Sequence, residues 1–569
     1  MKGNFSLTGF NALLVVLVMV SAVIAIFLPL PPQLVAPGFS SFVLFQSPGF
    51  YVPYIVCLIS IAALLWRSGD RISVSVFSVV VFSLLTVSIW ELKGPGGNYL
   101  VAGSYYASIA NQVTYSSHIV LGGWGDYPSI FISASTLEQI LGIKLDVVFS
   151  FMQAYGAALI GLFYLLIINC FVRSARLASA GAMLAIVADE ELMKLNEPPP
   201  YIGSLLFLIL VYILIRFFFV GRGNGLLPYL VLVFGSAITY PLVPLLIVMI
   251  VMSAVVSRFK RVPLRRATLL VAVPATVWVG WTVYMTEYIS LGQIFAENLY
   301  SILLGPNVST ASSSASGPFG YYLLQLLASN VTALPYGMGF LLPAWFLVFF
   351  GLGSTVWLFS RWIGSGDVPH LFFLGMFALS AAMLLALQYP TGTGWVRILP
   401  LMAPFVSVAL VSMARKYRLP FFGVVVVCLV LFTLPTLVAY TPNEGSQNAS
   451  YQWGFSASSF LGSHTTGNTV YIGSGLWTFN LNLQNRIVEG FDPSGGLTPN
   501  EAQVEISDQL TALTRSQDGS VLVVSPLFYS AWEHLYGLNS TQVIEHNLQN
   551  GTANLPLVYS NGYNLVWAK

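Results

Sequence analysis

The densest group of residues that could do chemistry in this chain is three adjacent carboxylates. Asp189, Glu190 and Glu191 stand in "VADEELMKLNEPPPY", directly after an apolar run. Carboxylates at the edge of a hydrocarbon layer are unfavourable unless a cation or a basic partner compensates their charge. Their oxygens suit a hard divalent ion such as Mg²⁺ or Mn²⁺. The cluster therefore predicts a divalent metal site, and a solvated helix end is the alternative interpretation.

Three isolated charged residues have contexts that also favour chemistry. Asp126 follows a glycine-rich stretch in "GGWGDYP", and glycines favour an irregular turn that can aim a side chain. Glu91 stands at the end of the apolar run 72–92. Arg397 begins another apolar run in "QYPTGTGWVRILP". A guanidinium there can hold a phosphate with two parallel hydrogen bonds, although it can also serve as an anchor whose head reaches the membrane surface.

The elements that position these residues fold in a hydrophobic solvent. Of the 569 residues, 56% are hydrophobic and 8% are charged, with a mean hydropathy of +0.78, whereas a soluble domain has about 25% charged residues. The first apolar run, Phe10–Leu30, has no small-residue cleavage site, so we expect it to remain as a membrane helix. The three cysteines lie within apolar runs, which argues against a disulfide framework. The sequence predicts a polytopic α-helical membrane protein.

Apolar runs of about 20 residues predict thirteen crossings. Their approximate bounds are 10–30, 49–66, 72–92, 147–172, 177–190, 201–219, 226–240, 242–257, 267–288, 338–360, 368–388, 397–413 and 419–440. Alternate loops carry the arginines and lysines, from Lys2 through the cluster 258–266 to Arg418. Basic loops remain in the cytoplasm, so the N-terminus is predicted inside and the region after residue 440 outside the cell membrane.

One stretch leaves a second topology open. Leu226–Ser257 is uncharged, and as one helix it would be about 48 Å long, against a hydrocarbon core of about 30 Å. Pro241 and Pro244 near its middle favour a break into two half-length helices. The competing model has eleven spans: this stretch crosses once, Leu177–Ala188 does not cross, and Arg222 lies outside.

The region 441–569 has the pattern of an extracytoplasmic α/β domain that follows a transmembrane domain, 1–440. It carries nine acidic and three basic residues. "NTVYIG" and "SVLVVS" are rich in β-branched residues, as strands are, and Thr498 begins a capping box. The last segment, "PLVYSNGYNLVWAK", predicts a β-hairpin around Asn561-Gly562, the dipeptide that a type I′ turn favours.

A long first outer loop, 93–146, is too polar for a membrane helix and too patterned for an irregular loop. Apolar residues recur at helical spacing in two stretches. They are Ala102, Tyr106, Ile109 and Val113 in the first, and Ile130, Ala134, Leu137 and Leu141 in the second. Polar residues fill the other faces, a pattern typical of helices that lie in the plane of the membrane interface.

This loop, with "YYASIANQV", "SHI", "DYPSIF" and "LGI" in order, resembles the membrane glycosyltransferases of the GT-C superfamily. Members are multi-span enzymes that use polyprenyl-phosphate-linked sugars. The resemblance covers the general plan of the chain, and its sequence motifs fall within Ser104–Ile143. The oligosaccharyltransferase signature WWDYG is absent from the terminal domain, so that particular enzyme is not implied.

The resemblance implies an outer-face transfer of a sugar from a lipid-linked donor to an acceptor glycan, lipid or protein. An outer-loop carboxylate serves as general base or metal ligand, and Asp126 or Glu91 would take this role, because the usual acidic position holds Ser104. Asp189, Glu190 and Glu191 would hold Mg²⁺ or Mn²⁺. The substrate-binding residues would be Arg397, His118, Tyr105, Tyr106 and Trp124.

Two other functions remain open at this point. Ser104 is compatible with a degenerate GT-C-fold protein that binds lipid-linked glycan or a protein partner without turnover. A transporter is the third possibility, but the chain shows no mid-membrane charged pair and no matching broken helices in two halves. No nucleic-acid partner is expected.

Overall fold

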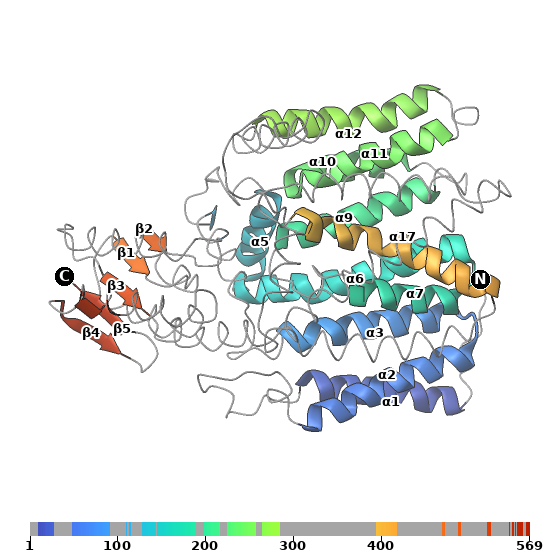
Figure 1. Cartoon of the computed structure of the whole chain (residues 1–569), viewed down its shortest axis with the longest axis horizontal. Coiled ribbons are helices and arrows are strands. Elements are labelled where there is room, and N and C mark those ends of the chain that lie inside the picture. Colours follow the sequence, from blue (N-terminus) through green and yellow to red (C-terminus); the bar gives the residue numbers. More distant parts are fainter. Residues whose placement is uncertain are drawn as a thin grey trace.

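The protein is described here by a computed structural model, shown in Figure 1. It describes residues 9–27, 48–91, 110, 113–114, 128–143, 145–188, 198–216, 225–257, 264–284 and 394–417 of the helical part. In the terminal region it describes residues 469–472, 487–490, 521–524, 546, 549–550, 552, 555–560 and 565–568.

The described part of the chain up to residue 417 is helical. Its helices are α1 (Gly9–Phe27), α2 (Pro48–Ser68), α3 (Ile72–Glu91), α5 (Pro128–Leu141), α6 (Leu145–Val172), α7 (Ala175–Ala188), α9 (Pro198–Ile215), α10 (Leu226–Thr239), α11 (Leu242–Ser257), α12 (Leu264–Tyr284) and α17 (Gly394–Tyr417). Ten of the thirteen expected spans coincide with one of these helices within a few residues. The other three, 338–360, 368–388 and 419–440, lie outside the described residues, so the total of thirteen remains a prediction.

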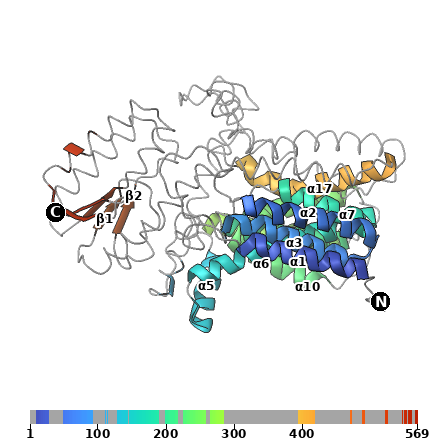
Figure 2. The same ribbon diagram turned by 90° about the horizontal axis from the view of Figure 1, so that it is seen from below.

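The long helices lie side by side, and α5 crosses one end of the bundle (Figures 1 and 2). We call this the α5 end. The α6–α7 turn lies at the other end, which we call the Asp70 end, because Asp70 Oδ1 there accepts hydrogen bonds from the Ser174 hydroxyl (2.6 Å) and the Arg176 backbone N–H (3.2 Å). These two bonds tie the α2–α3 connection to the beginning of α7.

The break near Pro241 is confirmed. α10 ends at Thr239, Tyr240 adopts an extended conformation, and α11 begins at Leu242. Thr239 Oγ1 contacts Ser129 of α5 at 3.0 Å, whereas the Tyr229 hydroxyl, near the beginning of α10, donates to the Leu270 carbonyl of α12 at 2.8 Å. α10 therefore ends at the α5 end and begins beside the beginning of α12. The stretch 226–257 is a helical hairpin and not the single crossing of the eleven-span model.

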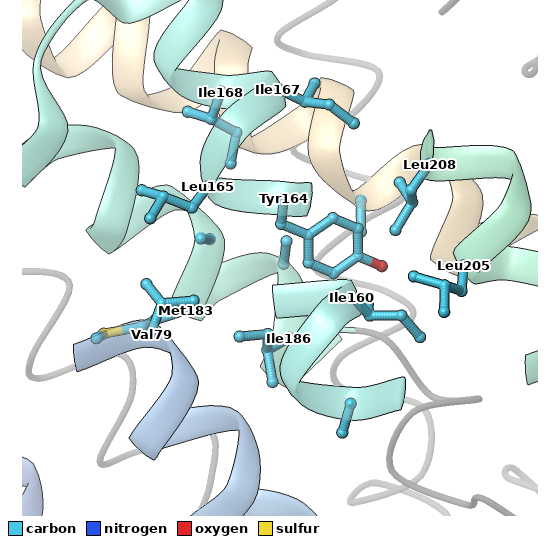
Figure 3. Packing of buried hydrophobic residues seen from close by; sticks show 14 of the residues in the cluster. Val79, Ile160, Tyr164, Leu165, Ile167, Ile168, Met183, Ile186, Leu205 and Leu208 are labelled. Atoms are coloured by element: carbon cyan, nitrogen blue, oxygen red, sulfur yellow. The ribbon is translucent and has the colours of Figure 1, made fainter. Parts of the chain in front are cut away.

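Small residues bring α6 against its neighbours at close range. A Cβ on Gly161 of α6 would overlap Ser83 of α3 and lie 3.1 Å from Ile186 of α7, and one on Gly156 would lie 2.6 Å from Tyr201 of α9. Figure 3 shows the resulting cluster, in which side chains of α3, α6, α7 and α9 interdigitate around Tyr164. Close approach of this kind is how helices associate in lipid.

The outside of the bundle is apolar. α1 exposes large hydrophobic side chains along its length, and α10 does so at Leu227, Val231 and Phe234. Among the described helices, one segment, Tyr155–Val172 of α6, is long and apolar enough to cross a membrane by length and composition, with a mean hydropathy of 2.1, and shorter apolar helices accompany it. Apolar faces this extensive are unfavourable in water and match hydrocarbon, so the bundle is suited to a lipid bilayer.

The terminal region contains a five-stranded sheet of order β2-β1-β3-β5-β4. Its strands are β1 (Thr469–Ile472), β2 (Ile487–Gly490), β3 (Val521–Val524), β4 (Leu557–Ser560) and β5 (Leu565–Ala568). β2, β1 and β3 are parallel, and β5 and β4 are antiparallel to their neighbours. This confirms the expected strands and a terminal hairpin. The helix expected from Thr498 lies outside the described residues, and the domain boundary at 440 remains a prediction.

The hairpin loop differs from the expected one. Ser560 pairs with Leu565, so residues 561–564 separate the strands, whereas a two-residue Asn561-Gly562 turn would pair Ser560 with Tyr563. The prediction of a type I′ turn was therefore wrong. β5 also pairs with β3, where Val524 lies opposite Leu565. Because β5 is hydrogen-bonded on both sides, its register is fixed by both ladders and not by the turn dipeptide alone.

Candidate functional site

Charge divides the bundle into two unlike ends. The described basic residues at the Asp70 end are Arg67, Arg71, Arg173, Arg176, Arg216, Arg265, Arg266, Arg415 and Lys416, each at or near a helix terminus. Within the described helices, Arg397 is the one basic residue that belongs to the opposite half. The acidic residues Glu91, Glu138 and Asp146 belong to elements of the α5 end. A cation placed against this bias is a candidate for binding an anion.

Arg397 lies in the first turn of α17. This helix packs antiparallel to α7: Val411 lies 2.9 Å from the position that a Cβ on Gly181 would take, and Arg415 donates to the Val172 carbonyl at the Asp70 end. Counting 1.5 Å per residue from Val411, Arg397 lies about 21 Å closer to the α5 end. The free N–H groups of a helix beginning add to the positive potential around this residue.

α7 ends deep inside the bundle. Ile186 lies level with Gly161 of α6, and α7 stops two residues later, at Ala188. At 1.5 Å per residue, this point is about 20 Å short of Leu145, the beginning of α6. The chain therefore enters the segment 189–197, which begins with the acidic cluster, well below the α5 end.

The next described residue after that segment is Pro198, at the beginning of α9. Tyr201 lies level with Gly156 of α6, so Pro198 lies about 10 Å closer to the α5 end than Ala188 does. Measured along α17 from Val411, Arg397 lies at about the same level as Pro198. The described residues on either side of the acidic segment are therefore Ala188, at the end of α7, and Pro198, at about the level of Arg397. Both α7 and α9 contact α17.

At the α5 end, α5 is tied to two other elements by side-chain hydrogen bonds. Thr114 Oγ1 lies 2.7 Å from Ser135 Oγ and 3.1 Å from Glu138 Oε2, and Ser129 contacts Thr239. Thr114 Oγ1 also lies 3.1 Å from the Ala110 carbonyl, so its one proton is donated either to that carbonyl or to the Glu138 carboxylate, and Ser135 can donate to Thr114. Ser135 is 4% exposed, so its hydroxyl depends on this bond.

α5 buries one half of its apolar pattern and exposes the other. Ile130 and Ala134 are buried, together with Phe131 and Ser135, whereas Leu137 and Leu141 are exposed. Figure 2 shows that α5 extends past the edge of the bundle. A helix was expected over this stretch and is present as α5, and its position in the membrane interface remains a prediction. Of the first expected interfacial helix, Ala110, Val113 and Thr114 are described, and they are helical.

Most of the predicted site residues lie outside the described residues. They are Tyr105, Tyr106, His118, Trp124, Asp126, Asp189, Glu190 and Glu191. The backbones of Glu91 and Arg397 are described, at the end of α3 and the beginning of α17. Among the described residues, no group of three or more His, Cys, Asp or Glu side chains gathers where a metal ion could bind, so the predicted metal site remains a prediction.

The residues that tie α5 in place were not predicted from the sequence: they are Thr114, Ser129, Ser135, Glu138 and Thr239. The available signal was weak, because serine and threonine within apolar helices commonly bond to their own backbone, as Thr239 also does with the Gly235 carbonyl. Their partners lie on other elements, and spacing along one element gives no information about those.

No family model and no curated protein matches the chain. Among solved structures, the chain is similar to the crystal structure of ArnT from Cupriavidus metallidurans bound to undecaprenyl phosphate, with 14% sequence identity and a TM-score of 0.47. The similarity covers 87% of this chain and 97% of that one. A TM-score of this size is too low to establish a shared fold.

Proposed function

We propose that this protein is a multi-pass membrane glycosyltransferase that moves a sugar from a polyprenyl-phosphate-linked donor to an acceptor on the outer face of the membrane. The observation that supports it best is the position of Arg397. This residue lies in the first turn of α17, whereas the other basic residues of the described helices lie at the Asp70 end. α17 also contacts α7 and α9, the helices before and after the acidic segment 189–197. Arg397 and the acids can therefore serve one site.

In this site Arg397 holds the phosphate of the donor. Its planar guanidinium offers two parallel N–H donors, and the N–H groups of the first turn of α17 point in the same direction as the positive end of the helix dipole. Both interactions grow stronger as the phosphate leaves the sugar and gains negative charge. A polar head held at this level lets the polyprenyl chain lie along the apolar outside of the bundle.

Asp189, Glu190 and Glu191 would hold a divalent cation, Mg²⁺ or Mn²⁺. Their sequence position fits such an ion for a specific reason: they follow the C-terminus of α7, where the helix dipole is already negative. Three carboxylates at this depth need positive charge to be tolerated. A bound cation would supply it and would also stabilise the charge of the departing phosphate.

The acceptor enters from the α5 end. Asp126, in the glycine-rich turn before α5, is the proposed general base, and Glu91, at the end of α3, is the second choice. Tyr105, Tyr106, His118 and Trp124 would contact the sugar of the donor or the acceptor. The N-terminus lies in the cytoplasm, and the region 441–569 forms the extracytoplasmic α/β domain.

The test is turnover of radiolabelled polyprenyl-phosphate hexoses by the full chain in lipid nanodiscs, with and without divalent metal. Asp189→Asn keeps the side-chain volume and removes a charge, so it should lower turnover by roughly 10²-fold or more. Arg397→Gln should weaken binding of undecaprenyl phosphate, and Arg71→Gln, the same charge change at the Asp70 end, should not. Equal binding by both arginine variants would contradict the proposed phosphate site.

A degenerate, non-catalytic protein is the second candidate, and the observation that favours it is Ser104 at the usual acidic position. It predicts binding of the lipid-linked sugar with no turnover under any metal condition. In that case Asp126→Asn and Glu91→Gln should leave binding unchanged.

A further inference from the structure

Arg67, in the last turn of α2, is placed by an aromatic ring and not by an acid. Its guanidinium carbon lies 4.4 Å from the centroid of the Phe10 ring of α1, and both side chains are exposed. Arg67 makes no hydrogen bond or ion pair with the residues that the structure describes. The ring therefore holds the cation in place and leaves its N–H donors available to an anion.

Arg71 adds a second cation close to the first. It stands directly before α3, is exposed, and pairs with no acid among the described side chains. Asp70, its neighbour in the chain, is directed to α7, where its Oδ1 accepts hydrogen bonds from Ser174 and from the Arg176 N–H. The N-terminus of α3 contributes further positive potential beside Arg71. We call Phe10, Arg67 and Arg71 the Arg67 corner, and it has a net positive charge.

The Arg67 corner lies at the level of a membrane interface. From it toward the α5 end, the outer faces of α1 and α2 are apolar, with large exposed side chains at Leu13, Val16, Val20, Val52, Ile55 and Ile59. Trp66, directly before Arg67, is 60% exposed, and tryptophan favours the membrane interface. The change from apolar side chains to arginines therefore marks the headgroup level, where the available anion is a lipid phosphate.

Two buried polar atoms lie beside this corner without a hydrogen-bond partner among the described residues. They are Asn11 Oδ1 and Ser68 Oγ, whose residues are 7% and 9% exposed. Cys57 of α2 donates to the Val18 carbonyl of α1 and so marks the line where the two helices face each other. Asn11 is about two helical turns from Val18, and Ser68 is about three turns from Cys57, so both residues lie on this line.

The heights of these atoms match the height of the corner. Measured from the contact between Cys57 and Val18 toward the Asp70 end, Asn11 lies at about 11 Å and Ser68 at about 17 Å. Phe10 and Arg67 lie between these two heights. Buried polar atoms without a partner are unfavourable, and a polar headgroup at the Arg67 corner would offer partners to both.

We infer that the Arg67 corner binds an acidic phospholipid of the leaflet at the Asp70 end. Its phosphate lies between the guanidiniums of Arg67 and Arg71, each of which can offer parallel N–H donors, and its acyl chains lie on the apolar outer faces of α1 and α2. Charge selects an acidic lipid, because a zwitterionic headgroup brings its own cation and adds no net attraction. The site is at the end opposite Arg397 and is independent of the proposed transfer reaction.

The experiment titrates phosphatidylglycerol into the full chain in detergent and measures the lipid-bound fraction by native mass spectrometry. Arg67→Gln should weaken binding by about fivefold and Arg67→Gln with Arg71→Gln by about thirtyfold, the factors for one and two basic side chains at a membrane surface. Arg67→Lys keeps the charge and should lose less than Arg67→Gln. Phe10→Leu removes the ring that holds Arg67 and should weaken binding by about threefold.

Arg265→Gln is the matched control, because it makes the same charge change at the Asp70 end on α12, which packs against α10 and α11. It should bind phosphatidylglycerol like the parent. Equal weakening by Arg265→Gln and Arg67→Gln would mean a general surface charge and would overturn the site. Phosphatidylcholine should bind more weakly than phosphatidylglycerol, and millimolar inorganic phosphate should not displace the lipid. Displacement by inorganic phosphate would overturn the assignment to a lipid.

Thermal unfolding keeps the test independent of folding defects. Phosphatidylglycerol should raise the thermal midpoint of the parent, as any ligand of the folded state does. The double variant should have nearly the parent midpoint without lipid, because both arginines are exposed, and a smaller rise with lipid. An equal rise in the parent and the double variant would overturn the inference. Because the phospholipid of a nanodisc already occupies this site, Arg71→Gln should still leave binding of undecaprenyl phosphate unchanged.

Discussion

At the scale of the residue, arginines show how position decides what one side-chain type does. Arg415 donates to the Val172 carbonyl and so satisfies a group that the end of α6 leaves free. Arg67 stacks over the Phe10 ring at 4.4 Å and links α2 to α1. Arg397 lies at the other kind of helix end, the N-terminus. It is in the first turn of α17, where the helix dipole makes the potential positive and favours an anion.

Arg173 is a fourth case, because its backbone carries strain. It connects α6 to α7 with a φ of 53°, in the left-handed region that favours glycine. Arg173→Gly should therefore raise the free energy of unfolding by roughly 1 kcal/mol, measured as a higher thermal midpoint in detergent. Arg176→Gly, in the helical conformation of α7, is the control and should lower it. A lower midpoint for Arg173→Gly would show that the side chain contributes more than the strain.

At the scale of the element, α7 depends on neighbours at every face. Most of its described residues are buried, and α3, α6 and α17 all contact it. It is about 21 Å long, shorter than a hydrocarbon core, so it cannot be stable as an isolated span. Its depth follows from packing against α6 and α17.

The close approach of α3, α6 and α7 gives a prediction about glycine. Gly161→Ala would place a Cβ against Ser83 and 3.1 Å from Ile186, so helices must separate, and unfolding should become easier by about 1–3 kcal/mol. Gly235→Ala in α10 meets no atom within 4 Å and should be neutral or slightly stabilising. Thermal unfolding in nanodiscs compares the two. Similar losses for both would mean that the glycines act through flexibility and not through packing.

The beginning of α7 gives a second prediction. Ser174 caps the helix, and Asp70 holds Ser174 through a 2.6 Å hydrogen bond and also accepts from the Arg176 N–H. Asp70→Ala should lower the free energy of unfolding by about 1 kcal/mol, as loss of a cap does. Asp70→Asn keeps an acceptor oxygen and should lose less than half of that. If urea unfolding gives equal losses for both, the charge and not the hydrogen bond holds this end.

At the scale of the whole molecule, the described basic residues other than Arg397 lie at the Asp70 end, because they stand at the helix termini that the alternating helix directions bring to that end. This is the asymmetry that the positive-inside rule expects of one membrane face. The hairpin α10–α11 contributes to it, because it returns the chain to the Asp70 end before the basic cluster 258–266. The predicted orientation has this end in the cytoplasm.

Cysteine labelling in intact cells tests that orientation. Cysteines at Ser314 and Ser494 should react with an impermeant thiol reagent, and one at Ser365 should react only after the cells are opened. A cysteine at Asn224 should also remain unlabelled in intact cells, because α10 begins at the end that carries the basic residues. Labelling of a cysteine at Ser365 from outside would reverse the orientation, and labelling of one at Asn224 would contradict the predicted cytoplasmic position of the beginning of α10.

The sequence by itself determined the helices and their directions. Runs of apolar residues set their bounds, Pro241 set the break between α10 and α11, and alternating arginines indicated which ends belong together. These features are local, because a helix satisfies its own backbone in lipid and a proline interrupts it wherever it stands.

Only the tertiary structure decided the relative depth of α7, the register of the terminal hairpin and the buried face of α5. Leu137 and Leu141 continue the apolar pattern of Ile130 and Ala134, yet they are exposed. In a bilayer, lipid accepts apolar side chains as readily as a neighbouring helix does, so apolar spacing cannot distinguish the two. The hydroxyls of Thr114, Ser135 and Thr239 do distinguish them, because a buried donor needs a partner at a defined place. That partner is chosen by the approach of distant segments, which no spacing along the chain encodes.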